Sequence, residues 1–115
     1  INMKNMKLMP DVFHMNIEDE SIGKEIAKYI KYVGYIHFAD SNRKIFGTGH
    51  IDFLDIMNNL KWVNYTGWIS VEILPYPSAY IAAKEAINYI KPIIYNYNFY
   101  IHLYIYIYSR KNRFI

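Results

Sequence analysis

Three ionisable side chains occupy equivalent positions along the chain, each at or near the end of a short apolar segment. They are Asp11, His37 and Glu72, and we expect the apolar segments to be strands at 7–13, 34–39 and 67–74. In a parallel α/β architecture the carboxyl ends of the strands form one rim, so these side chains are expected to lie together there. Two carboxylates and an imidazole suit a hard or borderline divalent cation such as Mn²⁺, Mg²⁺ or Co²⁺.

Each of these residues also has a plainer interpretation when it is taken alone. An aspartate at a strand end is commonly a helix cap, a lone histidine is commonly a core residue bonded to the backbone, and a glutamate at an edge is commonly a solvated charge. Three such residues at three successive strand ends share one position, and a shared position calls for a shared cause. The sequence therefore predicts a metal site at this rim.

Two further side chains extend the candidate site. His14 follows Asp11 by three residues, and Arg43 follows His37 by six, in a loop where a guanidinium can clamp a hydroxyl, a carboxylate or a phosphate. The Gly-Thr-Gly stretch at 47–49 is expected to make a tight turn, since a lone Gly-x-Gly is weak evidence for a phosphate site. We expect His50 to be structural or exposed.

The segments between the expected strands have helical periodicity. They are 21–33, 51–63 and 78–91, with Ser21, Asp52 and Ser78 as expected N-caps. The resulting order is β-α-β-α-β-α, which favours parallel strands covered by helices. Either a doubly wound sheet or a (β/α)8 barrel satisfies this order.

The composition bounds the class of protein. The chain has 115 residues, is 53 % hydrophobic and carries a net charge of +3. It contains no cysteine, so disulfides and thiolate metal sites are excluded, which fits a cytoplasmic location. The net charge gives no sign of nucleic-acid binding, and no apolar run reaches the 18 residues typical of a membrane span. We expect neither nucleic acid nor membrane as a partner.

The last residues differ in composition from the rest. Residues 93–115 hold six of the thirteen tyrosines and lack Gly, Ala, Pro, Val, Asp and Glu. We interpret 1–92 as the folded domain and 93–115 as a low-complexity Tyr/Ile/Asn tail, a composition expected from read-through. Its Tyr/Ile alternation would also suit a strand. An alternative is a membrane-surface anchor that ends in Arg110, Lys111 and Arg113.

Three motifs in order, "PDVFHMNIEDESI", "HFADSNRKIFGTGHIDF" and "ISVEILP", resemble the C-terminal part of the xylose-isomerase-like sugar isomerases and epimerases. The most similar subgroup is the D-tagatose/D-psicose 3-epimerase type. The resemblance implies a partial (β/α)8 TIM barrel comprising about the last three of eight βα units. It also implies that Asp11, His37 and Glu72 are metal ligands, that Glu72 is a catalytic acid/base, and that His14 and Arg43 contact the substrate.

By the same resemblance, the activity is metal-dependent isomerisation or epimerisation of a ketose, with proton transfer through a metal-bound enediolate. Such an epimerase uses two carboxylates on opposite faces of the sugar, and the motifs supply only Glu72. The partners implied are a ketose, an N-terminal barrel half that is missing here, and a second copy in a homo-oligomer. The chain begins with Ile1 rather than Met, which also points to missing upstream sequence.

Three alternative functions stay open at this point. The first two are a hydroxypyruvate-isomerase-like enzyme and an endonuclease-IV-like enzyme, both of which share the barrel. "HFADSNR" lacks the extra His and Asp ligands that a multi-zinc endonuclease would need. The third is a truncated, non-catalytic gene product, so whether the chain alone is an enzyme is left undecided.

Overall fold

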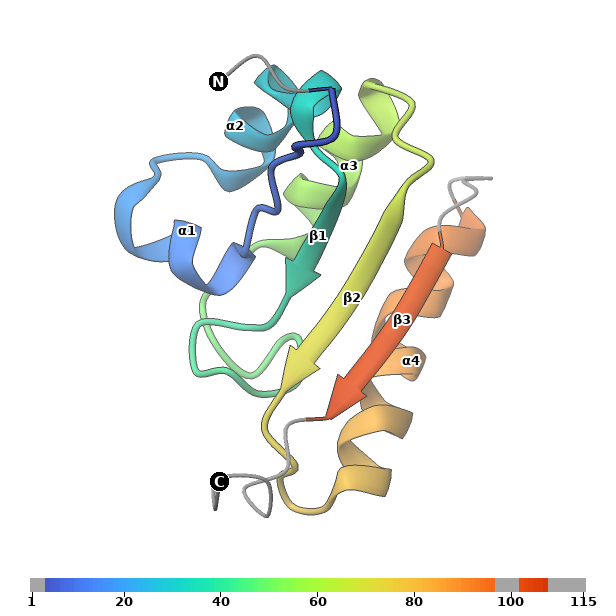
Figure 1. Ribbon diagram of the computed structural model, residues 1–115. Helices are drawn as coiled ribbons and strands as arrows, with labels where there is room; N and C mark the ends of the chain where they lie inside the picture. The colour runs from blue at the N-terminus through green and yellow to red at the C-terminus, as the bar shows by residue number, and fades with distance from the viewer. Residues whose placement is uncertain (1–3, 97–101, 108–115) are drawn as a thin grey trace.

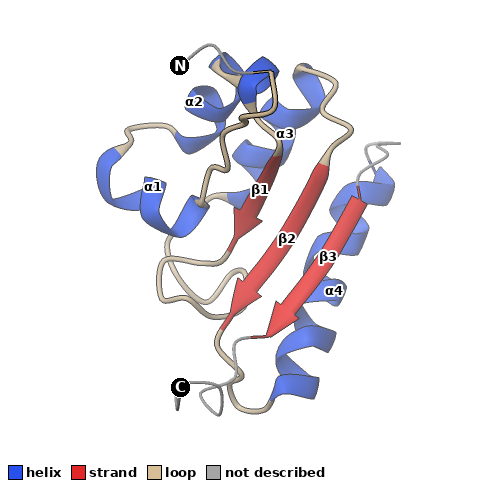
Figure 2. Ribbon diagram, in the orientation of Figure 1, coloured by secondary structure: helices blue, strands red, loops and turns tan. Residues whose placement is uncertain are grey.

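A computed structural model describes residues 4–96 and 102–107. Its strands are β1 (Tyr35–Phe38), β2 (Trp68–Ile73) and β3 (His102–Ile107), which pair in parallel in the order β1-β2-β3. The helices are α1 (Val12–Glu18), α2 (Ile22–Lys28), the 3-10 helix η1 (Ile30–Tyr32), α3 (Phe53–Trp62) and α4 (Ala79–Asn96). Figures 1 and 2 show α3 and α4 lying behind one face of the twisted sheet. The predicted α/β class, with parallel strands that alternate with helices, is confirmed from β1 onward.

The first expected strand, 7–13, is wrong over much of its length. The stretch before α1 runs beside β1 but makes only two isolated parallel bridges, Leu8 with Val33 and Asp11 with His37. Pro10 has no N–H to donate to a ladder. The carboxylate of Asp11 accepts the N–H of Phe13 at 3.0 Å, which starts α1 where the apolar pattern suggested continued strand.

Of the three N-caps expected from the sequence, two make the capping hydrogen bond and one does not. The Asp52 carboxylate accepts the Asp55 N–H at 2.9 Å at the start of α3, and the Ser78 hydroxyl accepts the Ile81 N–H at 3.2 Å at the start of α4. Both caps are confirmed. Ser21 makes no capping hydrogen bond, and the expected helix 21–33 is divided into α2 and η1.

The core lies between the sheet and its helices. Ile36 and Phe38 of β1 and the alternating apolar residues of β2 are fully buried there, because successive side chains of a strand point to opposite faces. Phe38 and Phe46 pack against Phe53, with ring centroids 5.4 and 4.6 Å from it. The opposite face of the sheet carries His37, Ser70 and Glu72, and in Figure 1 none of the labelled helices covers it.

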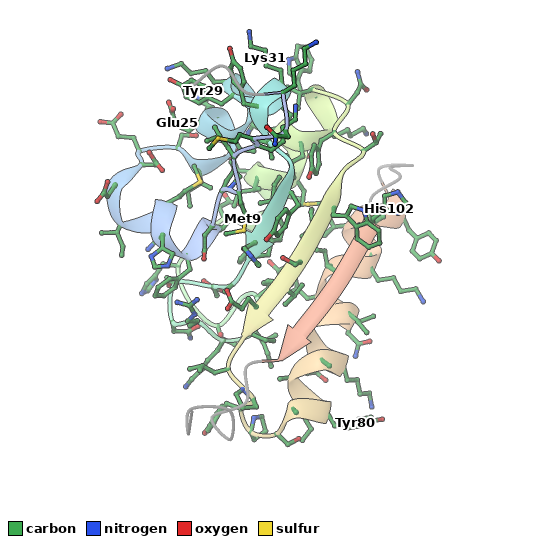
Figure 3. The ribbon with its side chains drawn as sticks, viewed as in Figure 1. Met9, Glu25, Tyr29, Lys31, Tyr80 and His102 are labelled. Carbon is green, nitrogen blue, oxygen red and sulfur yellow. The ribbon has the colours of Figure 1, made fainter. Side chains whose placement is uncertain are left out.

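The amino end of the sheet is also aromatic. His102 at the start of β3 stacks on Trp68 of β2, with ring centroids 4.7 Å apart (Figure 3). Met9 and the α2 residue Glu25, both labelled there, line an apolar groove with Tyr29.

Part of the C-terminal segment of unusual composition is a strand, because residues 102–107 form β3 and pair with β2. The interpretation of 93–115 as a separate read-through tail stays a prediction.

No helix within the described residues is long and apolar enough to cross a membrane. The proposed anchor at Arg110, Lys111 and Arg113 lies outside the described residues.

Tyr65 links the end of α3 to β2 and gives the fold a pH dependence. Its hydroxyl donates to the Trp68 carbonyl at 2.9 Å, and burial raises the pKa of Tyr65 from 10.0 to about 12. Folding therefore favours the protonated phenol. Its contribution to stability is complete below pH 10 and is lost as the pH rises through about 12.

We expect urea melts to show a free energy of unfolding that falls between pH 10 and pH 12. In Tyr65→Phe this fall should be shallower, although the variant starts about 1 kcal/mol less stable because the hydrogen bond is lost. Equal slopes in the two proteins would contradict this role of Tyr65.

Candidate active site

The strand register places the three expected metal ligands along the carboxyl-terminal part of the sheet. Asp11 is the bridge partner of His37, whose N–H donates to the Pro10 carbonyl at 2.9 Å. His37 is in turn the partner of Ser70 on β2, and Glu72 lies two residues further along. Because side chains alternate with a period of two, His37, Ser70 and Glu72 share the uncovered face.

The carboxylates on this rim face cationic or protonatable side chains. Glu72 Oε2 accepts a hydrogen bond from Arg43 Nη2 at 3.3 Å, and Asp11 Oδ2 lies 3.7 Å from His14 Nε2. Within residues 4–96 and 102–107, no three His, Asp or Glu side chains gather closely enough to hold a metal ion. The structure thus pairs Asp11 with His14 and Glu72 with Arg43 and places His37 against Ser70, and it does not gather the three expected ligands into one cluster.

Arg43 adopts a backbone conformation that is unusual for a residue other than glycine. Its φ of 60° lies in the left-handed region, which costs a residue with a Cβ roughly 1–2 kcal/mol. Two hydrogen bonds hold it there: the Arg43 N–H donates to the Asp40 carbonyl, and the Arg43 carbonyl accepts from Leu74, both at 2.8 Å. This conformation ties the loop after β1 to the end of β2, where Glu72 lies.

Asp40 organises that loop, and sequence reasoning did not single it out. Its side chain is fully buried and accepts three backbone N–H groups, from Ser41 at 2.7 Å, Gly47 at 2.8 Å and Ile51 at 3.2 Å. A Cβ at Gly49 would collide with this carboxylate, so glycine is required there. The signal in the sequence was an aspartate immediately after an apolar strand, followed by a glycine-containing loop.

Ser70 is the second residue that sequence reasoning missed. Its hydroxyl lies 2.6 Å from His37 Nδ1 and is almost completely buried. It fixes the imidazole plane, and the Tyr35 ring packs edge-on to that imidazole at 5.2 Å. Only the pairing of β1 with β2 brings Ser70 to His37, across 33 residues of sequence.

His50 lies apart from this rim. Its side chain is exposed, as expected, and its backbone N–H donates to the Ser41 hydroxyl at 2.8 Å. Together with Asp52 and Asp55 it lines a shallow pocket near the start of α3. It is therefore a suitable control position for tests of the rim.

The model of the xylose isomerase-like TIM barrel family matches residues 1–93. The chain belongs to this family. Within it, the chain is 39 % identical to the D-psicose 3-epimerase of Ruminiclostridium cellulolyticum over 72 residues, which is 63 % of this chain and 25 % of that enzyme. It is 41 % identical to the L-ribulose 3-epimerase of Mesorhizobium japonicum over 68 residues, or 59 % of this chain and 23 % of that enzyme.

Solved structures of the same barrel family agree with this assignment. A structure of L-ribulose 3-epimerase matches with a TM-score of 0.77 and 27 % identity, over 84 % of this chain and 38 % of that one. The predicted resemblance and the partial-barrel fold are both confirmed. The chain spans about a quarter of the length of these curated sugar epimerases.

Proposed function

We propose that this chain supplies the carboxyl-terminal part of a divalent-metal-dependent ketose 3-epimerase site. The observation that carries the proposal is the register of Asp11, His37 and Ser70 on neighbouring parallel segments, with Glu72 on the same face. Similarity to the D-psicose and L-ribulose 3-epimerases supports the substrate class, a ketose sugar.

The donor types of the rim suit a divalent cation, although the three side chains would have to move closer together than the structure has them to bind one ion. Asp11, His37 and Glu72 offer carboxylate oxygens and one imidazole nitrogen, which Mn²⁺, Mg²⁺ and Co²⁺ all accept. The side chains of Asp11 and Glu72 are 16 % and 26 % exposed, so both carboxylates are accessible. A cation would compete with His14 for Asp11 and with Arg43 for Glu72. When bound, it would supply positive charge that stabilises an enediolate formed from the sugar.

The proposed roles of this chain's own residues follow from their chemistry and position. Glu72 takes the proton from the carbon that is inverted, or returns it, as a general base or acid. Arg43 and His14 present N–H donors to the sugar's oxygens, and Ser70 orients the His37 imidazole.

Inversion of a carbon needs a second proton-transfer group on the opposite face of the sugar. Asp11 is proposed to act only as a ligand, whereas Glu72 is proposed to act both as a ligand and in proton transfer, so the rim offers one proton-transfer carboxylate among the described residues. We therefore expect epimerisation only when another part of a barrel supplies the second carboxylate, and we place the present residues in that larger site.

A graft tests this function directly. Residues 1–93 would replace the matching segment of the Ruminiclostridium cellulolyticum D-psicose 3-epimerase, and epimerisation of D-psicose would be followed by chromatography. The graft is expected to epimerise the sugar in the presence of Mn²⁺. A folded graft that binds the sugar but shows no turnover would refute the proposal.

A further inference from the structure

The guanidinium of Arg43 contacts two side chains on the rim, the charged Glu72 and the aromatic Phe13. Glu72 accepts one hydrogen bond from Nη2 at 3.3 Å, which is a long ion-pair contact. The guanidinium carbon also lies 4.7 Å from the centre of the Phe13 ring, within the range of a cation–π interaction. The Arg43 side chain is 33 % exposed, so solvent weakens its attraction to Glu72.

Phe13 is itself firmly placed. It is the second residue of α1, and its N–H donates to the Asp11 carboxylate at 3.0 Å. Its ring meets the His14 ring edge-on at 5.1 Å and packs against the hydrophobic core. The same short helix thus carries the Asp11 cap, His14 and the ring under Arg43.

We propose that Phe13 is the positioning residue of Arg43, holding the guanidinium at the rim independently of Glu72. This inference rests on the proposed function, in which Arg43 binds the sugar and Glu72 engages the cation and the sugar. A cation or substrate that engages Glu72 removes the ion pair. The aromatic face of Phe13 remains, and a held arginine side chain loses less rotamer freedom when a ligand binds.

The two possible supports of Arg43 predict opposite results in two variants. If the ring holds the side chain, Phe13→Leu should release it, whereas Glu72→Ala, which removes the hydrogen-bond acceptor as well as the charge, should leave it ordered. If the ion pair alone holds it, the reverse is expected. Leucine keeps an apolar side chain against the core, and Phe13→Tyr keeps the aromatic face.

The experiment is ¹⁵N relaxation of the Arg43 Nε–Hε group in the full 115-residue chain without metal. We expect an order parameter above about 0.8 in wild type, Phe13→Tyr and Glu72→Ala, and below about 0.6 in Phe13→Leu. The melting temperature of each variant is measured alongside, to exclude general unfolding. An ordered Arg43 in a folded Phe13→Leu variant would overturn the inference.

A separate readout keeps this inference distinct from the proposed function. Phe13 supplies no metal ligand, so a Mn²⁺-induced rise in melting temperature should persist in Phe13→Leu. Loss of Arg43 order in Phe13→Leu without any Mn²⁺ effect in wild type would support the positioning role and count against the metal site. An Arg43 that stays ordered in Phe13→Leu, together with a Mn²⁺-induced rise in the melting temperature of wild type, would refute the positioning role and leave the metal site supported.

Discussion

Asp40→Ala is expected to destabilise the chain by about 3–5 kcal/mol, among the largest effects of a single substitution here. The Asp40 carboxylate accepts three backbone N–H groups in a fully buried position. Removing it leaves the buried Ile51 N–H without a partner, at a cost of about 1–3 kcal/mol, and it also removes the part-buried hydrogen bonds from Ser41 and Gly47. The loop that carries Arg43 would also lose the side-chain hydrogen bonds that join its two ends.

Urea unfolding measures this loss, and Asp52→Ala is the matched control. Asp52 is also an aspartate that accepts a backbone N–H, from Asp55, but it is exposed and caps a helix with a single hydrogen bond. Its removal should cost about 1 kcal/mol. Similar losses in the two variants would mean that Asp40 does not hold the loop together.

Glu72→Gln is expected to lower the rate of proton exchange by about 10²–10⁴-fold in the epimerase graft. Glutamine keeps the shape of the side chain and can still meet Arg43, but it cannot take or return a proton. The measurement is the incorporation of solvent deuterium into the sugar at the inverted carbon, followed by NMR. Binding of the sugar should change much less than the exchange rate.

Glu85→Gln provides the control for this substitution. Glu85 lies exposed on α4, whereas Glu72 lies on the opposite, uncovered side of the sheet. It should exchange deuterium at the rate of the unaltered graft. A Glu72→Gln graft that exchanges as fast as the Glu85→Gln graft would remove Glu72 from the proposed mechanism.

Sequence patterns predicted those features that depend on local chemistry. The helical periodicity and the caps at Asp52 and Ser78 are confirmed, because a cap is decided within one turn of helix. The strand prediction over 7–13 failed for a related reason. The apolar pair Val12–Phe13 suits either a strand or a helix, and the capping bond to Asp11 decides for the helix.

The rest of the candidate site depends on contacts between distant segments. Ser70 meets His37 through the register of two strands, and Asp40 becomes central only when its loop folds around it. Pairing of Arg43 with Glu72 likewise crosses 29 residues. Spacing in the sequence indicated the rim and the five candidate residues. The side chains that these residues contact could be identified only from the folded structure.

The most direct test of the metal site is the melting temperature of the purified 115-residue chain with and without Mn²⁺. A cation that binds only the folded state at about 100 times its Kd adds about 2.7 kcal/mol, a shift of more than about 10 °C for a domain of this size. We expect this shift in wild type and His50→Ala, and its loss in Asp11→Asn and His37→Ala. A cooperative melt that Mn²⁺ leaves unchanged in wild type, or raises equally in all four proteins, would contradict it.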